Sequence, residues 1–148
     1  MSTIKIYTIG FTQTSAETFF GKLIKENIRK IVDVRLNNSS QLAGFAKKDD
    51  LKYFLKALGN IDYVHMPSLA PNKELLTEYK KKKCDWQVYK KKFLAFMEER
   101  RADNIISPEE LDRACLLCSE HHPEYCHRRL VAEYIKNKWG NVEIEHLV

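Results

Sequence analysis

The chain has 148 residues, of which 44% are hydrophobic and 30% are charged, and its formal net charge is +5. This apolar content excludes a disordered chain, and the length suits one domain over residues 1–148. No run reaches the roughly 20 apolar residues that cross a bilayer, and the first residues lack the apolar stretch of a signal peptide. We therefore expect a cytoplasmic protein without membrane contact, whose four cysteines are reduced thiols.

The first part of the chain alternates strand and helix patterns. Residues 4–10 are rich in β-branched side chains and alternate apolar with other residues, which predicts a strand that ends in a turn at Gly10. Thr14 and Glu17 have the spacing of a capping box, so a helix is predicted from there to about residue 27. The apolar run at 31–35 then predicts a buried parallel strand.

The middle of the chain continues this alternation. Apolar residues at helical spacing predict a helix over 49–59, with Gly59 suited to its cap. A strand is predicted at 62–66, where Pro67 ends it. Two further helical patterns cover 72–82 and 86–101.

The last part of the chain predicts a short helical turn at Pro108, an apolar strand at 114–118 and a final strand at 142–146. Between these strands, Pro123 can open a helix and Gly140 can close it. Strands that alternate with helices predict an α/β fold with a mostly parallel sheet of about five strands and helices on both faces.

Chemically versatile residues follow several of the predicted strands. Ligands bind beyond the carboxyl ends of the strands in such sheets, and Gly10, Arg35 and the segment that starts at Cys118 all lie there. The twelve residues 118–129 hold two thiols, three imidazoles, two carboxylates and two guanidiniums. Within this segment Cys126 falls near a helix start, where free N–H groups stabilise a thiolate or a bound phosphate.

Our leading hypothesis is a pocket for a small anionic ligand, such as a phosphorylated metabolite or a nucleotide. Arg35 and Arg128 would clamp its oxygens, and the Gly10 turn and the helix start at Cys126 would complete the pocket, near Cys118. For catalysis, we expect Cys126 as nucleophile or redox thiol, His127 as its base or ion-pair partner, and Glu120 as orienting carboxylate or general base. The opposing interpretation is that the two thiols fill apolar gaps and that Glu120 pairs with an arginine.

Two alternatives come from other classes of protein. The whole positive excess lies in residues 73–101, and a nucleic-acid-binding module could use the basic surface Lys80–Lys92, unless this surface is only a solvated helix face. A thiol redox or metal-binding protein is the other alternative, because the segment 118–127 offers thiolate and imidazole ligands. A structural zinc site normally has a second close pair of ligands, and without one we predict no metal ligands here. Cofactor and oligomeric state stay open.

Four motifs carry a resemblance to the family domain of unknown function 488. They are the opening Tyr-Thr-Ile-Gly-Phe-Thr at 7–12, Val-Asp-Val-Arg at 32–35, Cys-Ser-Glu at 118–120 and Cys-His-Arg at 126–128. The resemblance implies a Rossmann-like fold, here a three-layer sandwich, and a site at these motifs, but no agreed activity. The family's opening motif commonly reads T-I-G-H-S or T-I-G-Y-S. Phe11 and Thr12 replace its last two residues, which removes a polar ring atom and keeps a hydroxyl at Thr12 as a ligand-binding group.

Overall fold

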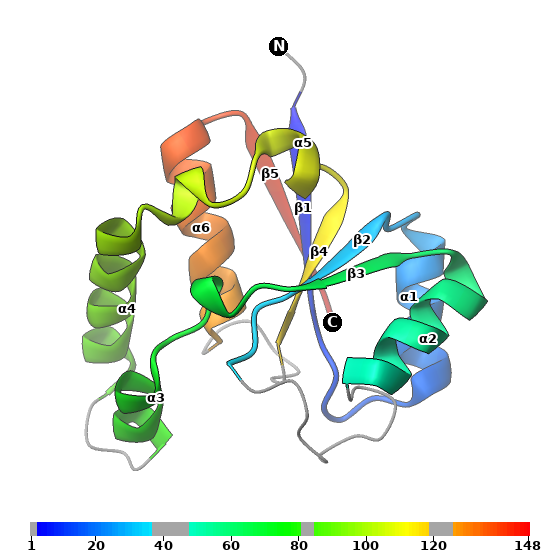
Figure 1. The fold of residues 1–148 in the computed structure, drawn as a ribbon, viewed down its shortest axis with the longest axis horizontal. Coiled ribbons are helices and arrows are strands. Elements are labelled where there is room, and N and C mark those ends of the chain that lie inside the picture. The colour runs from blue at the N-terminus through cyan, green and yellow to red at the C-terminus, as the bar shows by residue number, and fades with distance from the viewer. Residues whose placement is uncertain (1–2, 37–47, 81–84, 119–125) are drawn as a thin grey trace.

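The computed structural model describes residues 3–36, 48–80, 85–118 and 126–148 (Figure 1). Five strands in these ranges form one all-parallel sheet in the order β3-β2-β4-β1-β5. The strands are β1 (Ile4–Gly10), β2 (Lys30–Asp33), β3 (Asp62–His65), β4 (Ala114–Cys118) and β5 (Val142–Leu147). Because all five run in the same direction, their carboxyl ends meet at one edge of the sheet.

Helices cover both faces of the sheet. Helices α1 (Ala16–Lys25) and α2 (Lys48–Gly59) lie on one side, and α3 (Lys73–Lys80), α4 (Trp86–Arg100) and α6 (His127–Trp139) lie on the other (Figure 1). The shorter elements are η2 (Pro67–Leu69), η3 (Ala102–Asn104) and α5 (Pro108–Leu111). This arrangement confirms the predicted α/β three-layer sandwich with a parallel sheet.

The two faces of β4 are packed into two different hydrophobic clusters. Ala114, Leu116 and Cys118 belong to the cluster under α4 and α6, whereas Cys115 and Leu117 belong to the cluster under α1 and α2. All five residues are buried, as expected for a central parallel strand that is covered on both sides. The strand that leads into the candidate site is therefore held firmly on both faces.

Two helix ends differ from the predicted positions, because neighbouring residues have similar capping properties. The side chain of Ser15, not that of Thr14, caps α1, and it accepts a hydrogen bond of 3.1 Å from the backbone N–H of Thr18. Gly59 is the last residue of α2, and Asn60 takes the left-handed conformation at φ 53°. Asparagine tolerates this conformation better than most residues, so it can follow a helix in the place of glycine.

Two other boundaries concern the site. Strand β2 ends at Asp33, so Val34 and Arg35 follow the strand rather than belong to it. Helix α6 begins at His127, with Cys126 as its N-cap residue. The predicted helix opening at Pro123 lies outside the described residues, as do residues 81–82 of the helix predicted at 72–82.

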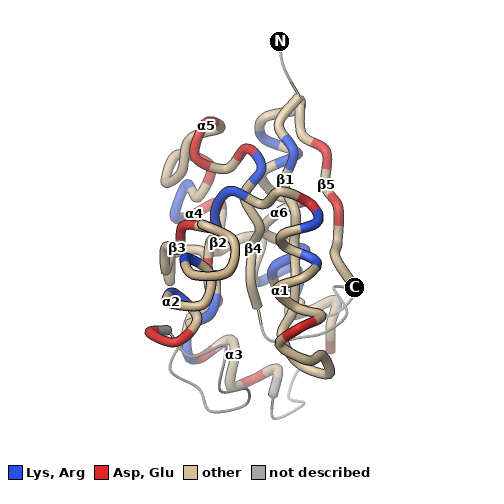
Figure 2. Tube along the Cα trace, turned by 90° about the vertical axis from the view of Figure 1, so that its right-hand side faces the viewer, with Lys and Arg blue, Asp and Glu red and all other residues tan. Residues whose placement is uncertain are grey.

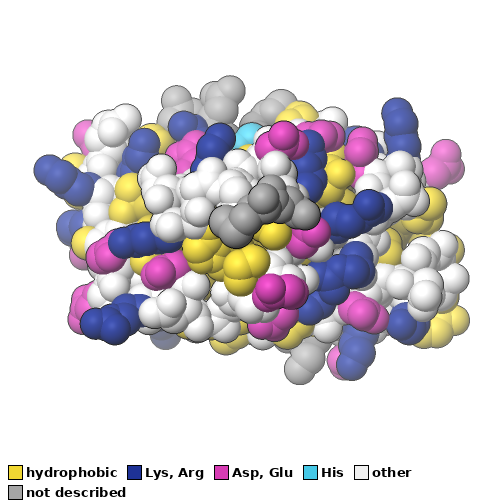
Figure 3. All heavy atoms as spheres, turned by 90° about the horizontal axis from the view of Figure 1, so that it is seen from above, with side chains coloured by type: hydrophobic (Ala, Val, Ile, Leu, Met, Phe, Trp, Pro, Cys, Tyr) yellow, Lys and Arg dark blue, Asp and Glu magenta, His cyan; other side chains and the backbone are white. Residues whose placement is uncertain are grey.

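Charges of both signs are mixed over the described surface. On the edge strand β5, Glu143 and Glu145 form an acidic row, and the Glu145 carboxylate lies 3.2 Å from the Lys5 ammonium of β1 (Figure 2). Charged side chains of this kind discourage pairing of an edge strand with another chain. The face at the amino ends of the strands, opposite the candidate site, also shows basic and acidic side chains interspersed (Figure 3). None of the described helices combines the length and the apolar character needed to cross a membrane.

Candidate functional site

The carboxyl edge of the sheet brings three segments of the chain together. Cys118 is the last residue of β4 and is paired in register with Gly10, the last residue of β1. Cys126 and His127 start α6, which packs against β4 and β1. Val34 follows β2, and its backbone N–H donates to the carbonyl of Leu117 in β4. Strand β4 therefore holds the site between the end of β2 and the start of α6.

The imidazole of His127 links the end of β2 to the sulfur of Cys118. Its Nε2 lies 2.6 Å from the carbonyl oxygen of Val34, and its Nδ1 lies 3.5 Å from Cys118 Sγ. A carbonyl can only accept a hydrogen bond, so Nε2 must carry a proton. The Nδ1 atom is therefore left to face the sulfur, either as a lone pair beside a thiol or as an N–H beside a thiolate.

Electrostatics favour the thiolate at Cys118. A hydrogen bond from the Cys126 thiol lowers the pKa of Cys118 most strongly; burial opposes this, and the charge of His127 and its hydrogen bond lower the pKa further. Burial and the neighbouring Cys118 raise the pKa of Cys126. Burial alone would lower the pKa of His127, but the charge and hydrogen bond of Cys118 and the Val34 carbonyl raise it. The charge is thus concentrated on one sulfur, with two hydrogen-bond donors around it.

The site is enclosed by protein. Cys118 is 4% exposed, Cys126 is 2% exposed and His127 is 8% exposed. The ring of Phe93 in α4 contacts the imidazole, with ring centroids 5.8 Å apart. One donor atom from each of the three site residues lies within 4.8 Å of the others, so together they could hold a metal ion.

A buried ion pair fixes the segment that carries Val34. The Arg35 guanidinium donates two hydrogen bonds to the Asp33 carboxylate, from Nε at 2.9 Å and from a terminal nitrogen at 2.7 Å. The phenol of Tyr63 in β3 donates a third hydrogen bond of 2.6 Å to the same carboxylate. The Phe11 ring lies 5.0 Å from the guanidinium carbon of Arg35. Arg35 thus orders the end of β2, and its side chain is already engaged with Asp33.

A second polar network runs from α6 to the edge strand. The Arg128 side chain is fully buried, and its Nε donates to the hydroxyl of Thr8 at 3.3 Å. Thr8 is also fully buried and lies opposite His146 in the pairing of β1 with β5, where its hydroxyl is 2.6 Å from His146 Nδ1. Because a buried hydroxyl needs an acceptor for its own proton, we assign Thr8 as the donor and His146 as the acceptor.

The network around His146 predicts how stability depends on pH. Burial, followed by the charge of Arg128, lowers the pKa of His146 below its ordinary value of 6.5, with Glu133 opposing and Arg129 reinforcing this shift. The unfolded chain then binds more protons than the folded chain below pH 6.5, so the stability that neutral His146 provides is lost as the pH falls from there. Denaturant unfolding of the wild type and of His146→Asn at pH 7.5 and 5.0 should show a smaller stability advantage of the wild type at pH 5.0.

The comparison between pH 7.5 and 8.5 is the control for this prediction, because neutral His146 predominates at both values and the difference between the two proteins should stay constant. Asparagine keeps an acceptor for Thr8 but does not titrate, so the change with pH isolates the imidazole. A wild-type advantage that grows on acidification would contradict the assigned network.

The structure brings together several of the predicted site residues. Gly10, Cys118, Cys126 and His127 converge at the carboxyl edge, and Arg35 and Arg128 lie behind this edge as buried side chains. Thr12 follows β1 and is partly exposed. Glu120 lies outside the described residues, so its predicted role is not placed.

Three residues of the polar networks beside the site were not among the predicted site residues. Thr8 and His146 lie 138 positions apart, and only the pairing of β1 with β5 reveals their contact. A buried threonine between two strand residues was a weak signal, because threonine is common in strands for its shape alone. Tyr63 gave no signal, since its partner Asp33 is 30 positions away.

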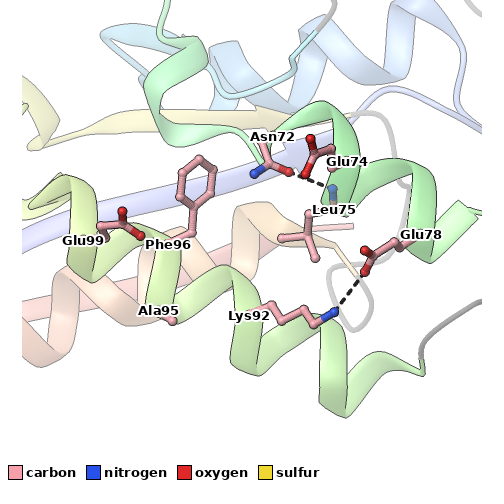
Figure 4. Close-up of a pocket in the computed structure, with 8 residues that line it drawn as sticks. All are labelled: Asn72, Glu74, Leu75, Glu78, Lys92, Ala95, Phe96 and Glu99. Atoms are coloured by element: carbon pink, nitrogen blue, oxygen red, sulfur yellow. Dashed lines mark hydrogen bonds and ion pairs between the residues drawn. The ribbon is translucent and has the colours of Figure 1, made fainter.

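The basic surface Lys80–Lys92 includes residues 81–84, which lie outside the described residues, and its described part borders a pocket with acidic side chains. A pocket of about 320 Å³ lies between α3 and α4 (Figure 4). Its lining comprises Asn72, Glu74, Leu75, Glu78, Lys92, Ala95, Phe96 and Glu99. Lys92 is paired with Glu78 at 3.0 Å across it, and the rings of Trp86 and Tyr89 stack at 5.4 Å and pack against the core. This pocket is lined by residues other than those of the Cys118 site, and the aromatic rings that could stack on bases contact one another instead.

Comparisons with known proteins agree with the motifs. No curated protein and no solved structure matches the chain. The family model "Domain of unknown function DUF488" matches residues 15–135, a range that includes the end of β2, the end of β4 and the start of α6. As this match covers well over half of the sequence, the chain belongs to the DUF488 family, as its motifs predicted.

Proposed function

We propose that the protein is a thiol-dependent enzyme that acts on a small anionic substrate, with Cys118 as the nucleophile. The observation that carries the proposal is the 3.5 Å contact between Cys118 Sγ and His127 Nδ1, in a ring whose other nitrogen is held by Val34. A nucleophile beside a base that is oriented by a third group is the arrangement used in covalent catalysis.

The proposed reaction needs the site residues, the substrate and one water molecule. The Cys118 thiolate forms a bond to the electrophilic atom of the substrate, and the leaving group departs with its bonding electron pair. His127 donates its Nδ1 proton to that leaving group. A water molecule then forms a bond to the same electrophilic atom and gives a proton to Nδ1, while the Cys118 sulfur departs with its bonding electron pair as the thiolate. The Val34 carbonyl keeps the ring in the required orientation throughout.

The sequence led us to expect Cys126 as the nucleophile, but the geometry favours Cys118. Cys118 Sγ contacts the imidazole, and the Cys126 thiol donates a hydrogen bond to Cys118. Cys126 is therefore proposed as the supporting thiol. Its position as the N-cap residue of α6 suits this role, because the positive end of the helix dipole also stabilises a thiolate nearby.

Preference for an anionic substrate is supported by the charges beside the site. Arg128 follows His127 at the start of α6, its side chain is buried, and its positive charge lowers the pKa of Cys118. Buried positive charge and the amino end of a helix both create a potential that attracts anions. Arg128 is proposed to act through this potential and through its bond to Thr8.

The proposal predicts which thiol reacts. In metal-free, reduced protein at pH 7, iodoacetamide should alkylate Cys118 faster than Cys115 or Cys126, and His127→Gln should slow this reaction by about tenfold. Glutamine can still donate a hydrogen bond to Val34 but cannot carry a positive charge, so the thiolate loses its ion-pair partner. Peptide mass mapping of timed samples measures the rate at each cysteine.

Two internal comparisons make this experiment decisive. Cys115 is a fully buried thiol three residues before Cys118, and burial raises its pKa, so it reports on general unfolding. The variant Tyr134→Phe removes a hydroxyl of the same helix α6 that donates to Asp103 rather than to the site, and it should leave the Cys118 rate unchanged. Equal alkylation of Cys115, Cys118 and Cys126, or an equal effect of His127→Gln and Tyr134→Phe, would contradict the proposed role of Cys118.

A further inference from the structure

The three residues of the site offer the donor atoms that zinc-class metal ions prefer. Two sulfurs and one imidazole nitrogen lie within 4.8 Å of one another, and all three side chains are buried. Thiolate and imidazole ligands select Zn²⁺ and similar soft or borderline ions over Mg²⁺ or Ca²⁺. These are ligands that segment 118–127 offers in the sequence, and the fold brings their donor atoms together across the eight positions between the two cysteines.

The distance between Cys118 Sγ and His127 Nδ1 already matches the distance between two ligand atoms of one zinc ion. In a tetrahedral site with Zn–S of about 2.3 Å and Zn–N of about 2.0 Å, the sulfur and nitrogen ligands lie about 3.5 Å apart. The distance from Cys118 Sγ to His127 Nδ1 is 3.5 Å. These two ligands would therefore need little movement to bind one ion.

The orientation of His127 is that of a metal ligand with a supporting partner. A ligating histidine almost always donates its other ring N–H to a carbonyl or a carboxylate, which fixes the ring and raises its basicity. The Val34 carbonyl accepts such a bond from Nε2 at 2.6 Å. Nδ1 is thereby left as the atom that faces Cys118 Sγ, at 3.5 Å.

We infer that Cys118, Cys126 and His127 form a site for one Zn²⁺ ion, of which these three side chains are ligands within the described part of the chain. Two thiolates and one imidazole are ligand types found in zinc sites of proteins. The inference stands on the donor geometry and does not require the proposed thiol chemistry. It has one consequence for that chemistry, since a bound ion occupies the Cys118 sulfur and blocks it as a nucleophile.

Cobalt binding tests the site directly. The full chain with Cys84→Ser, reduced and stripped of metal by a chelator, is titrated with Co²⁺, whose thiolate bonds give strong near-ultraviolet absorption. We expect one ion per chain, displaced by one equivalent of Zn²⁺, and about half of the thiolate absorption per ion in Cys126→Ser. The affinity of this variant should fall at least about 100-fold, because loss of even a supporting partner costs about 10–100-fold.

The controls separate ligand loss from unfolding. Cys115→Ser removes another buried thiol of the same strand and should bind Co²⁺ as the parent protein does. Circular dichroism of each metal-free variant shows whether it is folded, and His127→Gln provides a second ligand variant if Cys126→Ser is not. Absence of thiolate absorption in the parent protein, or binding that is unchanged in both ligand variants, would overturn the inference.

Alkylation with and without metal distinguishes this inference from the proposed function. Zn²⁺ should protect Cys118 from iodoacetamide, and a chelator should restore the metal-free rate. Rapid alkylation that Zn²⁺ does not slow would remove the metal site and leave the thiol proposal standing. Tight Zn²⁺ binding by a protein whose metal-free Cys118 is inert would remove the thiol proposal and support the metal site.

Discussion

Replacement of Asp33 with alanine should lower the free energy of unfolding by about 3–5 kcal/mol. Asp33 is fully buried and Arg35 is 4% exposed, so the substitution leaves a guanidinium in the interior without its carboxylate. It also removes the acceptor of the Tyr63 phenol and of the Arg35 backbone N–H. Denaturant unfolding followed by circular dichroism measures the loss.

An exposed ion pair that involves the neighbouring strand β3 provides the matched control. Asp62 of β3 pairs with Lys56 at 3.1 Å, and their side chains are 59% and 61% exposed. Because solvent screens such a pair, Asp62→Ala should cost less than about 1 kcal/mol. The double variant Asp33→Ala with Arg35→Met should recover part of the loss, since it removes the stranded charge. Similar losses in the free energy of unfolding for Asp33→Ala and Asp62→Ala would show that the buried pair stabilises the fold no more than the exposed pair does.

Truncation of the Phe93 side chain should lower the free energy of unfolding by a similar amount, because it removes apolar packing. Phe93 is fully buried in α4, its ring stacks on Tyr89 at 6.2 Å, and it contacts the His127 imidazole. Phe93→Ala should lower the free energy of unfolding by about 3–5 kcal/mol, because it removes buried surface and leaves a cavity between α4 and α6. Denaturant unfolding again provides the measurement.

The same variant tests whether α4 supports the site. Without the Phe93 ring, His127 loses its packing partner, so the preference of iodoacetamide for Cys118 should weaken along with the stability. Phe54→Ala is the control, because Phe54 in α2 is 36% exposed and lies over the opposite face of the sheet. A large loss for Phe54→Ala, or an unchanged Cys118 rate in folded Phe93→Ala, would contradict this role of α4.

The fold was predictable from the sequence because its signals are local. The apolar run at 114–118 matches β4 residue for residue, and the alternation at 4–10 matches β1. The helix caps were harder to predict. Thr14 and Ser15 have similar capping chemistry, and only the backbone conformation decides which of them caps α1. Likewise, the positive φ after α2 fell on Asn60, which tolerates it, rather than on Gly59.

The candidate site was predictable as a region but not as an arrangement. Strand ends and a helix start indicated where Cys118, Cys126 and His127 would gather. Which sulfur faces the imidazole depends on the distance between β4 and α6, and no spacing in the sequence encodes that distance. Arg35 and Arg128 were expected at the rim as ligand clamps, and their burial follows from Asp33 and Thr8, which offer them internal partners.

The strand order has a consequence for the growing chain. β1 is synthesised before the other four strands of the sheet, yet its two neighbours, β4 and β5, begin only at Ala114 and Val142. During synthesis, the backbone N–H and C=O groups of residues 4–10 have no strand partner on either side of β1 until more than a hundred further residues have been added. Long-range parallel pairing of this kind is slow and leaves apolar edges open to wrong partners. Of the five strands of this sheet, the one synthesised first is therefore among the last to be enclosed.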